Sequence, residues 1–328
     1  MNILAINFGG IGDEIFFLPT LISLKKEFSQ CKITLALEPR SKSVKELTDV
    51  IDNLFFVDIK GKNKYLELLK LVFKARCGNF DIVISSGGNK FISILLRLTG
   101  IKKCYGYDTG KLSQLLLTKA VPLNKNQYAC DMYHDLITPL TSIRTELPEI
   151  NIPPQEKIPN SVLIHPGVSK ISLQKGITKT ISPSIWADVI NILLNEKRHV
   201  ILAGGPDDDD CIKTILSLVD INNKNLENYY GKTKNLRDLA VLIGKSEKFI
   251  CSDSAPLHIA VAMKTKAYPI FGPTDDKKLI PQSSLVVPIK ADDNCPIKPC
   301  LWEKRQTTCK TLQCLKITAE NVQKIINL

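Results

Sequence analysis

The chain has 328 residues and 44% of them are hydrophobic, so at about 150 residues per domain it is long enough for two domains that each bury a core. Its formal net charge at pH 7 is +11, which favours partners that carry negative charge, such as phosphorylated substrates, anionic lipid or nucleic acid. Residues 1–150 hold 20 basic against 15 acidic residues and the remainder holds 24 against 18; with no basic arm and no recognisable binding motif, nucleic acid is not an expected partner.

The sequence predicts neither a secretory leader nor a membrane-spanning segment. Met1 leads directly into a strand-like apolar run, without the basic start and long apolar stretch of a secretory leader. No apolar run approaches the roughly 18 residues that a spanning helix needs. We therefore expect a cytoplasmic protein, which could still lie against a membrane.

The first half of the chain alternates apolar runs with amphipathic ones. Strands are predicted at 2–7, 32–37, 53–59 and 80–86, and helices at 14–28, 43–50 and 64–76. The predicted strands are apolar throughout, as in a sheet that is covered on both faces. This alternation predicts a parallel sheet with helices on both sides.

A proline-rich stretch then interrupts the pattern. Residues 147–160 contain four prolines, which stop helices and cannot donate to a sheet ladder, and we place an interdomain linker at 151–160. The predicted organisation is therefore one domain at 1–150, a second at 161–317 and a C-terminal helix at 318–328.

The second half restarts the same alternation. A strand and turn are predicted at 161–167, further strands at 199–205, 248–253 and 266–272, and helices at 182–196, 210–219, 235–246 and 256–263. Parallel sheets bind ligands beyond the carboxyl ends of their strands, so two such domains can aim those ends at one cleft.

Three predicted strand ends in the second half carry residues suited to a nucleotide: His165-Pro166-Gly167, Gly204-Gly205-Pro206 and Ser252–His258. In the last, Ser or Asp can cap a helix, Pro256 falls near its first turn, and His258 can donate to an anion. Each stretch alone also fits an ordinary turn into a helix. Three within one domain indicate a nucleotide site.

Several motifs, in this order, resemble the heptosyltransferases of glycosyltransferase family 9: "GGIGDEIFFLPTL", "LIHPG", "AGGPDDDD", "LRDLAVLI", "CSDSAPLHIAVAM" and "IFGPTD". The resemblance covers nearly the whole chain. It implies a GT-B fold, with two Rossmann-like doubly wound domains facing across a cleft. It also implies an inverting, metal-independent transfer of heptose from ADP-heptose to the inner core of lipopolysaccharide, with no cofactor.

The loop "FGGIGDE" at residues 8–14 follows the first predicted strand, and its carboxylates would repel a phosphate. It also lacks the third glycine of the dinucleotide fingerprint, because Ile15 stands there. The resemblance implies a different use for the loop.

In the implied use, the glycines give sugar and acceptor room near the backbone, and Asp13 is the general base that deprotonates the acceptor hydroxyl. Such a base contributes about 10²–10⁴ in rate. The alternative is that Asp13 caps the helix and has no catalytic role. The glycines concerned are Gly9, Gly10 and Gly12.

On the donor side, Asp253, Ser254 and His258 match the D-[ST]-G-P-x-H block that contacts the nucleotide diphosphate in the family. Ala255 stands where that block has Gly, and Thr274 of "GPTD" is expected to help close the pocket.

Two further donor contacts are less uniquely placed. Asp208 matches an acidic position that would accept hydrogen bonds from the ribose, although its acidic neighbours fit equally and a solvated acidic helix start is the alternative. Lys179 stands nearest to a family lysine that contacts phosphate, with Lys170 and Lys175 or a solvated lysine loop as alternatives. The family's Trp-Pro after that lysine is here Ser182-Pro183.

Four cysteines near the end of the chain are spaced C-x4-C-x8-C-x4-C: Cys295, Cys300, Cys309 and Cys314. They could bind zinc, but structural zinc sites usually have cysteine pairs that are closer in sequence. We therefore expect no metal, and either packing thiols or disulfides formed after purification.

The helix at 64–76 places four basic residues beside Leu66, Leu69 and Phe73. It either packs on its sheet with its lysines in water or rests on anionic lipid.

With an anionic glycan or lipid-linked acceptor, this contact with lipid would be at the cytoplasmic face of the inner membrane.

Two alternative functions stay open. A nicotinamide-dependent oxidoreductase is disfavoured by the missing third glycine, and Glu38 is the only candidate for the acidic residue that binds the ribose. A non-catalytic relative that binds nucleotide sugar or glycan is supported only by Ala255 and the altered lysine loop.

Overall fold

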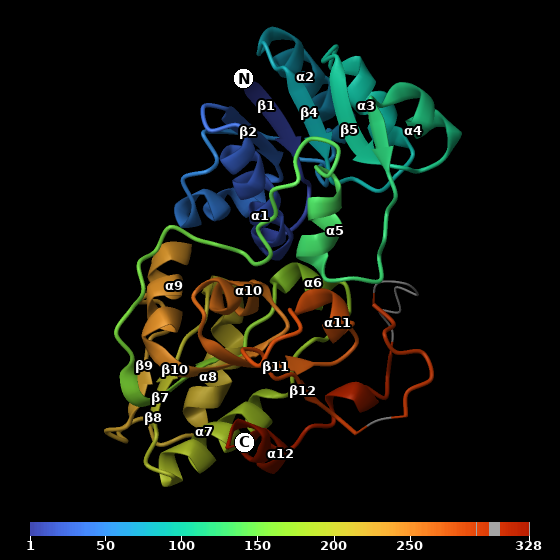
Figure 1. The fold of residues 1–328 in the computed structure, drawn as a ribbon. Coiled ribbons are helices and arrows are strands. Elements are labelled where there is room, and N and C mark those ends of the chain that lie inside the picture. The colour runs from blue at the N-terminus through green and yellow to red at the C-terminus, as the bar shows by residue number, and fades with distance from the viewer. Residues whose placement is uncertain (293, 302–308, 328) are drawn as a thin grey trace. The chain divides into compact units, whose positions relative to one another are not determined.

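The computed structural model describes residues 1–292, 294–301 and 309–327. The chain divides into two compact units, Met1–Asn151 and Ile152–Leu328, and each is described by itself (Figure 1). Both units hold a six-stranded sheet in which every pair of neighbouring strands is parallel.

The first unit is a doubly wound α/β domain with strand order β3-β2-β1-β4-β5-β6. Its strands are β1 (Asn2–Ile6), β2 (Lys32–Leu37), β3 (Asn53–Phe56), β4 (Ile82–Ser85), β5 (Lys103–Tyr107) and β6 (Lys119–Val121). Its helices are α1 (Ile11–Glu27), η1 (Pro39–Leu47), α2 (Lys64–Cys77), α3 (Phe91–Leu98), α4 (Lys111–Leu116) and α5 (Ala129–Asp135).

The second unit repeats this topology with strand order β12-β11-β10-β7-β8-β9. Its strands are β7 (Ile158–His165), β8 (His199–Leu202), β9 (Leu226–Asn228), β10 (Ser246–Ser252), β11 (Lys266–Phe271) and β12 (Ile289–Lys290). Its helices are α6 (Lys170–Gln174), α7 (Pro183–Asn195), η2 (Pro206–Asp208), α8 (Asp209–Ser217), α9 (Leu236–Lys245), α10 (Ala255–Ala262), α11 (Asp276–Leu279), η3 (Gln313–Leu315) and α12 (Ala319–Ile326).

In each sheet the chain steps outward on one side of its first strand and then returns to the other side. The strand order therefore reverses between β1 and β4 in the first unit and between β7 and β10 in the second. Doubly wound sheets bind ligands at the carboxyl ends of the strands beside this reversal. Asp253 directly follows β10, and Asp13 lies in the first turn of the helix that follows β1.

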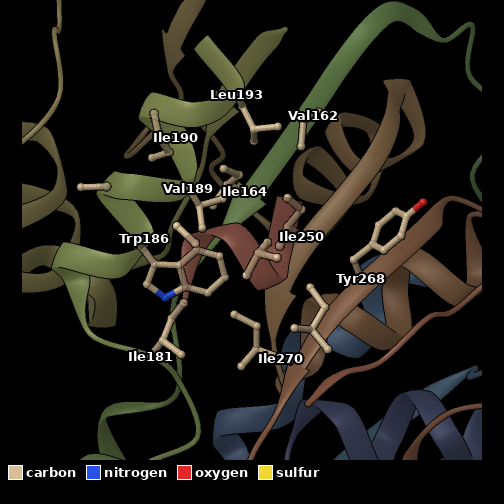
Figure 2. Packing of buried hydrophobic residues seen from close by; sticks show 14 of the residues in the cluster. Val162, Ile164, Ile181, Trp186, Val189, Ile190, Leu193, Ile250, Tyr268 and Ile270 are labelled. Atoms are coloured by element: carbon tan, nitrogen blue, oxygen red, sulfur yellow. The ribbon is translucent and has the colours of Figure 1, made fainter. Parts of the chain in front are cut away.

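The core of the second unit is formed by α7 against the sheet (Figure 2). Trp186 and Ile190 of α7 are fully buried and belong to one cluster with Ile164 of β7, Ile250 of β10 and Ile270 of β11. The strands alternate with helices that present apolar residues every three or four positions, so the apolar pattern of the sequence becomes this layer contact.

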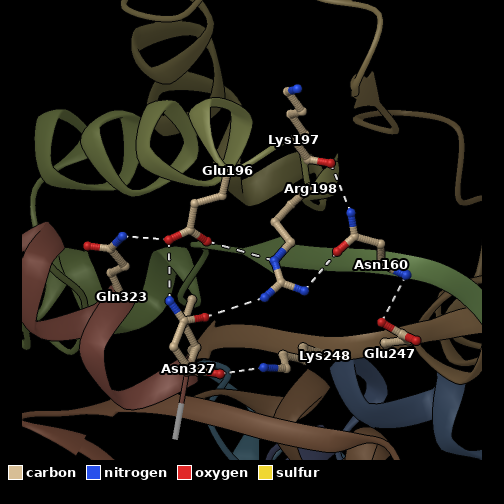
Figure 3. Close-up of polar contacts among 9 residues, drawn as sticks. Asn160, Glu196, Lys197, Arg198, Glu247, Lys248, Gln323 and Asn327 are labelled. Atoms are coloured by element: carbon tan, nitrogen blue, oxygen red, sulfur yellow. Dashed lines mark hydrogen bonds and ion pairs between the residues drawn. The ribbon is translucent and has the colours of Figure 1, made fainter.

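The last helix, α12, is fastened to the second sheet by both apolar and polar contacts. Val322 and Ile326 are buried in the cluster described above. On the surface beside them, Glu196 Oε1 accepts from Gln323 Nε2 at 2.5 Å, and Arg198 donates to Oδ1 of Asn327, the C-cap of α12, at 3.4 Å (Figure 3). The C-terminal helix is thus part of the second unit.

Several predicted boundaries were wrong. The helix expected at 43–50 is a 3₁₀ helix that runs from Pro39 to Leu47. Its proline lies in the first turn, where proline is tolerated. Strand β7 begins at Ile158, so the last residues of the predicted linker belong to the sheet, and β3 ends at Phe56 rather than at residue 59. The stretch 87–146, which carried no prediction, forms two strands and three helices.

Replacing Ile190 with alanine should lower the free energy of unfolding of the second unit by about 2–5 kcal/mol, because it leaves a cavity among rigid neighbours. Tryptophan fluorescence during urea unfolding measures this, since both tryptophans follow residue 152 in the sequence. The control Ile221→Ala, at a side chain that is 64% exposed, should change the value by less than about 0.5 kcal/mol. Equal effects of the two variants would contradict the packing described.

Candidate functional site

A buried carboxylate organises the carboxyl edge of the second sheet. Asp253, which follows β10, is 2% exposed. Its Oδ2 accepts from Lys179 Nζ at 2.9 Å and from Thr274 Oγ1 at 2.7 Å. Lys179 lies in the loop before α7, and Thr274 lies in the loop after β11. One carboxylate oxygen therefore ties together three segments that are far apart in the sequence.

The charges of this cluster are settled by their surroundings. Burial alone would raise the pKa of Asp253, but the charge and hydrogen bond of Lys179 and the hydrogen bond of Thr274 hold that pKa below its ordinary value. Burial lowers the pKa of His258 to about 4, and the nearby Asp253 carboxylate only partly opposes this. At neutral pH the cluster holds an ionised Asp253 and a neutral His258.

A second set of contacts holds the lysine loop in place. The Ser252 hydroxyl lies 2.7 Å from both Pro166 O and Thr180 Oγ1, and the Trp186 indole Nε1 donates to Thr180 Oγ1 at 2.9 Å. Because Thr180 follows Lys179 directly, these contacts fix the backbone that carries the lysine. Sequence analysis missed Thr180 and Trp186; a tryptophan one turn into a helix is a signal only once that helix is known to face the loop.

The three candidate lysines are separated by the structure. Lys179 contacts Asp253, whereas Lys170 and Lys175 are exposed at the two ends of the short helix α6. The side chain of Lys179 is 19% exposed, so its ammonium can still meet a ligand. Of the three, Lys179 alone joins the Asp253 cluster in the part of the chain that the structure describes.

Helix α10 begins beside this cluster with an open first turn. Ser254 is its N-cap residue but makes no side-chain capping hydrogen bond, and Ala255 is its first helical residue and is partly exposed. Pro256 lies next in the chain and has no N–H to satisfy. The first backbone N–H groups of a helix attract anions when no side chain caps them.

Asp208 is distinguished from its acidic neighbours by burial. It is 6% exposed, while Asp207 and Asp210 are exposed. Its Oδ2 accepts from the backbone N–H of Gly205 at 2.7 Å. A methyl group at Gly167 would lie 2.1 Å from this carboxylate, so the position requires glycine. Its described contacts make Asp208 the cap of a helix start, and a contact to ribose stays a prediction.

Asp208 also lies next to a second buried histidine. The Nε2 atom of His165, at the end of β7, is 3.9 Å from Asp208 Oδ2. Burial lowers the pKa of His165 and raises the pKa of Asp208, and each group partly opposes the shift of the other. The contact joins two of the three strand ends that the sequence singled out.

In the first unit, Asp13 closes the start of α1. Its Oδ2 accepts from the backbone N–H of Gly10 at 2.7 Å, and its Oδ1 accepts from the Tyr133 hydroxyl at 3.3 Å. A methyl group at Gly9 would lie 2.2 Å from the Asp13 side chain, so Gly9 makes room for it. The capping alternative is therefore observed, but a carboxylate has about four acceptor positions and Asp13 is partly exposed.

The other glycines of this loop are placed differently. A methyl group added at Gly10 would lie 3.7 Å from its nearest neighbour, Asp13 Oδ2, and would therefore fit. Gly12 is a partly exposed residue in the first turn of α1. Room for a sugar beside these glycines remains a prediction.

Glu14, next to Asp13, is a functional candidate that sequence analysis passed over. It is 1% exposed, and burial raises its pKa well above the ordinary value. The Asp13 charge raises that pKa further, while Asn7 and Arg40 oppose the shift. Burial therefore favours the protonated form of Glu14. The burial of the Glu14 side chain could be expected only once the structure showed that this position of α1 faces the interior of the unit.

A sequence model described as "Glycosyltransferase family 9 (heptosyltransferase)" matches residues 68–310. That match spans most of the chain and includes the Asp253 cluster. The chain belongs to glycosyltransferase family 9. It is therefore a glycosyltransferase, which excludes the nicotinamide-dependent oxidoreductase.

Individual relatives agree with this assignment. Lipopolysaccharide heptosyltransferase 3 of Escherichia coli is 26% identical over 298 residues, which cover 86% of each chain. Lipooligosaccharide heptosyltransferase 2 of Campylobacter jejuni is 22% identical over 313 residues, which cover 93% of this chain and 92% of the relative.

Solved structures confirm the GT-B fold. The E. coli ADP-heptose lipopolysaccharide heptosyltransferase II structure has a TM-score of 0.74 at 17% identity and covers 100% of this chain and 98% of its own. A family 9 glycosyltransferase from Veillonella parvula has a TM-score of 0.75 at 20% identity, with coverage of 99% and 96%.

The late cysteines of this glycosyltransferase are brought together. Cys295, Cys300, Cys309 and Cys314 all line one small cavity beside Pro273. Within the described residues no group of three or more His, Cys, Asp or Glu side chains is arranged to hold a metal ion. Residues 302–308 of this stretch lie outside the description. Within the described part, no helix has both the length and the apolar character to cross a membrane.

Replacing Lys179 with methionine should lower the free energy of unfolding by about 3 kcal/mol, because it leaves the buried Asp253 carboxylate without its charge partner. Urea unfolding measures the change. Lys170→Met, at an exposed lysine of the same loop, should change the value by less than about 0.5 kcal/mol. Adding Asp253→Asn to Lys179→Met should recover much of the loss, and a double variant no more stable than Lys179→Met would contradict the pairing.

The free energy of unfolding should decrease as the pH is lowered, because of His258. Between its ordinary pKa of 6.5 and its pKa of about 4 in the folded protein, the unfolded chain binds a proton that the folded chain does not. The free energy of unfolding therefore decreases as pH falls through this window, by up to about 1.4 kcal/mol per pH unit. Urea unfolding from pH 7 to pH 4 should show a shallower dependence in His258→Gln. His199→Gln, at a histidine that is 38% exposed, should keep the original slope.

Proposed function

We propose that this glycosyltransferase moves a heptose from ADP-heptose to a glycan of the lipopolysaccharide core, with inversion at the anomeric carbon and without a metal ion. The names of its relatives supply the sugar and the acceptor class. The observation that carries the proposal is the Lys179–Asp253–Thr274 cluster, which holds an ammonium group beside the open first turn of α10.

The donor side of the proposal follows from charge. A nucleoside diphosphate leaves with negative charge on its terminal phosphate, and preorganised donors stabilise that charge as it develops. Lys179 supplies a cation whose position is fixed by Asp253 at 2.9 Å. The first N–H groups of α10 add the positive end of a helix dipole. His258, neutral at neutral pH, adds a hydrogen-bond donor without adding charge.

The acceptor side depends on Asp13. In the proposed step, the acceptor hydroxyl gives its proton to the Asp13 carboxylate as its oxygen attacks the anomeric carbon. The bond from that carbon to the phosphate oxygen breaks, and ADP departs with the electron pair. The hydrogen bonds from Gly10 and Tyr133 hold the carboxylate in one orientation and leave further lone pairs for the proton.

The proposed location follows from the acceptor. A lipid-linked core glycan is presented at a membrane surface, so we propose a cytoplasmic enzyme that contacts the cytoplasmic face of the inner membrane peripherally. The net charge of +11 suits an anionic surface of this kind.

Asp13→Asn should lower kcat for heptose transfer by about 10²–10⁴-fold, because the amide cannot take the acceptor proton. Its oxygen can still accept from Gly10, so the fold should be retained. Transfer is measured by mass spectrometry of a core acceptor, and NMR of the product gives its anomeric configuration. Asp188→Asn, at an exposed aspartate of α7, is the matched control and should leave kcat unchanged.

Several outcomes would contradict the proposal. If Asp13→Asn transferred heptose at more than half the normal rate, Asp13 would not be the base. A product with retained configuration would exclude direct inversion. Activity lost in EDTA and restored by Mg²⁺ would exclude a metal-independent reaction. Tight binding of ADP-heptose with no transfer to any core acceptor would favour the binding relative instead.

A further inference from the structure

Three helices of the first unit carry an unusual number of apolar side chains on their outer face. Of the 16 large apolar residues that are exposed in the described chain, nine lie on α2, α3 and α4. We call these nine the apolar face: Tyr65, Leu66, Leu69, Phe73, Phe91, Ile94, Leu98, Leu112 and Leu115. Exposed fractions reach 70% at Phe73 and 80% at Leu115. Helix α3 contacts both α2 and α4, so the three helices form one layer.

Helix α2 shows why this face is not the ordinary edge of a core. Leu71 and Ala75 are buried, and Leu68 packs with them against the sheet. Leu66, Leu69 and Phe73 repeat at the same spacing of three and four residues on the solvent side. A helix that only covers a sheet needs one apolar stripe, but α2 has two. Contiguous exposed apolar patches mark a surface that contacts another partner.

The segment of the chain that contains these three helices is strongly basic. Residues 60–111 contain 11 lysines and arginines against three acidic residues, a net charge of +8. The rest of residues 1–150 contains 9 against 12, a net charge of −3. Counting charges by halves of the sequence hid this asymmetry. Six of these eleven basic residues lie on α2, α3 and α4, the helices that carry the apolar face.

Individual lysines lie directly beside the aromatic members of the face. Lys64 Nζ is 4.8 Å from the ring centroid of Tyr65, and Lys90 Nζ is 5.5 Å from that of Phe91. Lys70 and Lys74 are exposed between the turns that carry Leu66, Leu69 and Phe73. Basic side chains alternating with aromatic and aliphatic ones are typical of helices that lie in the headgroup region of a bilayer.

We propose that the apolar face and its surrounding lysines bind the surface of an anionic phospholipid bilayer. The apolar side chains would enter the headgroup region, and the lysines would meet the lipid phosphates. The charge argues against a second copy of this chain, since two copies of this basic segment would repel each other. Nucleic acid would leave the nine exposed apolar side chains uncovered.

This surface goes beyond the transfer reaction. That the bilayer is the one carrying the sugar acceptor rests on the proposed function, but binding to anionic lipid does not. The two are therefore tested separately, lipid binding with no donor or acceptor present and transfer with a soluble core glycan and no vesicles.

Vesicle flotation tests the proposal with the full chain. The protein should float with vesicles of 30% phosphatidylglycerol in phosphatidylcholine at 0.1 M NaCl and should remain unbound with pure phosphatidylcholine. Raising NaCl to 0.5 M should weaken binding strongly, because the Debye length falls from about 10 Å toward a few ångströms. Each lysine near such a surface contributes about fivefold in affinity.

Two double variants separate the contribution of the lysines to vesicle binding from that of the apolar side chains. Lys70→Gln with Lys74→Gln should weaken binding about 25-fold, because two charge contacts are lost. Leu69→Ser with Phe73→Ser should remove detectable binding at the same salt concentration. Leu218→Ser with Ile221→Ser, at apolar residues of the second unit that are 50% and 64% exposed, is the matched control and should bind as the unchanged protein does. Urea unfolding verifies that each variant is folded.

The proposal is overturned if the protein does not float with phosphatidylglycerol vesicles, or if the two face variants bind as well as the control. A dimer in analytical ultracentrifugation that dissociates in Leu69→Ser/Phe73→Ser, without vesicle binding, would assign the face to a second copy. Transfer to the soluble glycan should be unchanged in all these variants, so loss of lipid binding leaves the proposed reaction intact and the converse also holds.

Discussion

The buried carboxylate of Asp253 is the constraint on which the site of the second unit depends. A carboxylate that is 2% exposed must be paired, because an isolated buried charge is strongly destabilising. Lys179 and Thr274 pair it, and this places an ammonium group at the start of α10. The contacts of Thr180 with Ser252 and Trp186 then anchor the same loop to the core. Stability and positive potential at this edge of the sheet are therefore produced by the same residues.

The two units use the same device after a glycine pair. Asp13 accepts from Gly10 N at 2.7 Å, and Asp208 accepts from Gly205 N at the same distance. Capping alone therefore does not distinguish a catalytic carboxylate from a structural one. The two carboxylates differ in exposure, because Asp208 is buried against His165 whereas Asp13 is partly exposed. A cap is compatible with catalysis, since it holds the carboxylate in one rotamer and leaves it lone pairs.

The position of the basic residues in the fold shows an asymmetry that the net charges of the two halves of the sequence do not. The two halves of the sequence have nearly equal net charges, which gave no reason to favour either as the binding half. In the fold, six of the eleven basic residues of 60–111 lie on the layer of α2, α3 and α4, which also carries apolar side chains exposed to solvent. The physical consequence is a surface that combines attraction to anions with apolar area, and such a surface differs from an evenly basic protein.

The sequence by itself determined the doubly wound class, because continuous apolar strands alternating with amphipathic helices have few other solutions. Through local motifs it also identified the family and, within the cluster, Asp253, His258 and Thr274. It missed the edge strands β9 and β12, which have three and two residues and too few apolar positions to form a pattern. It also mistook the 3₁₀ helix after Pro39 for an α-helix.

Only the tertiary structure decided which of several equivalent residues enters a site. Lys179 rather than Lys170 or Lys175 meets Asp253, and Asp208 rather than its acidic neighbours is buried. The roles of Trp186 and the burial of Glu14 likewise became visible only in three dimensions. The reason is that pairing and desolvation are set by contacts between segments distant in sequence, whereas strand and helix patterns are set by neighbours along the chain.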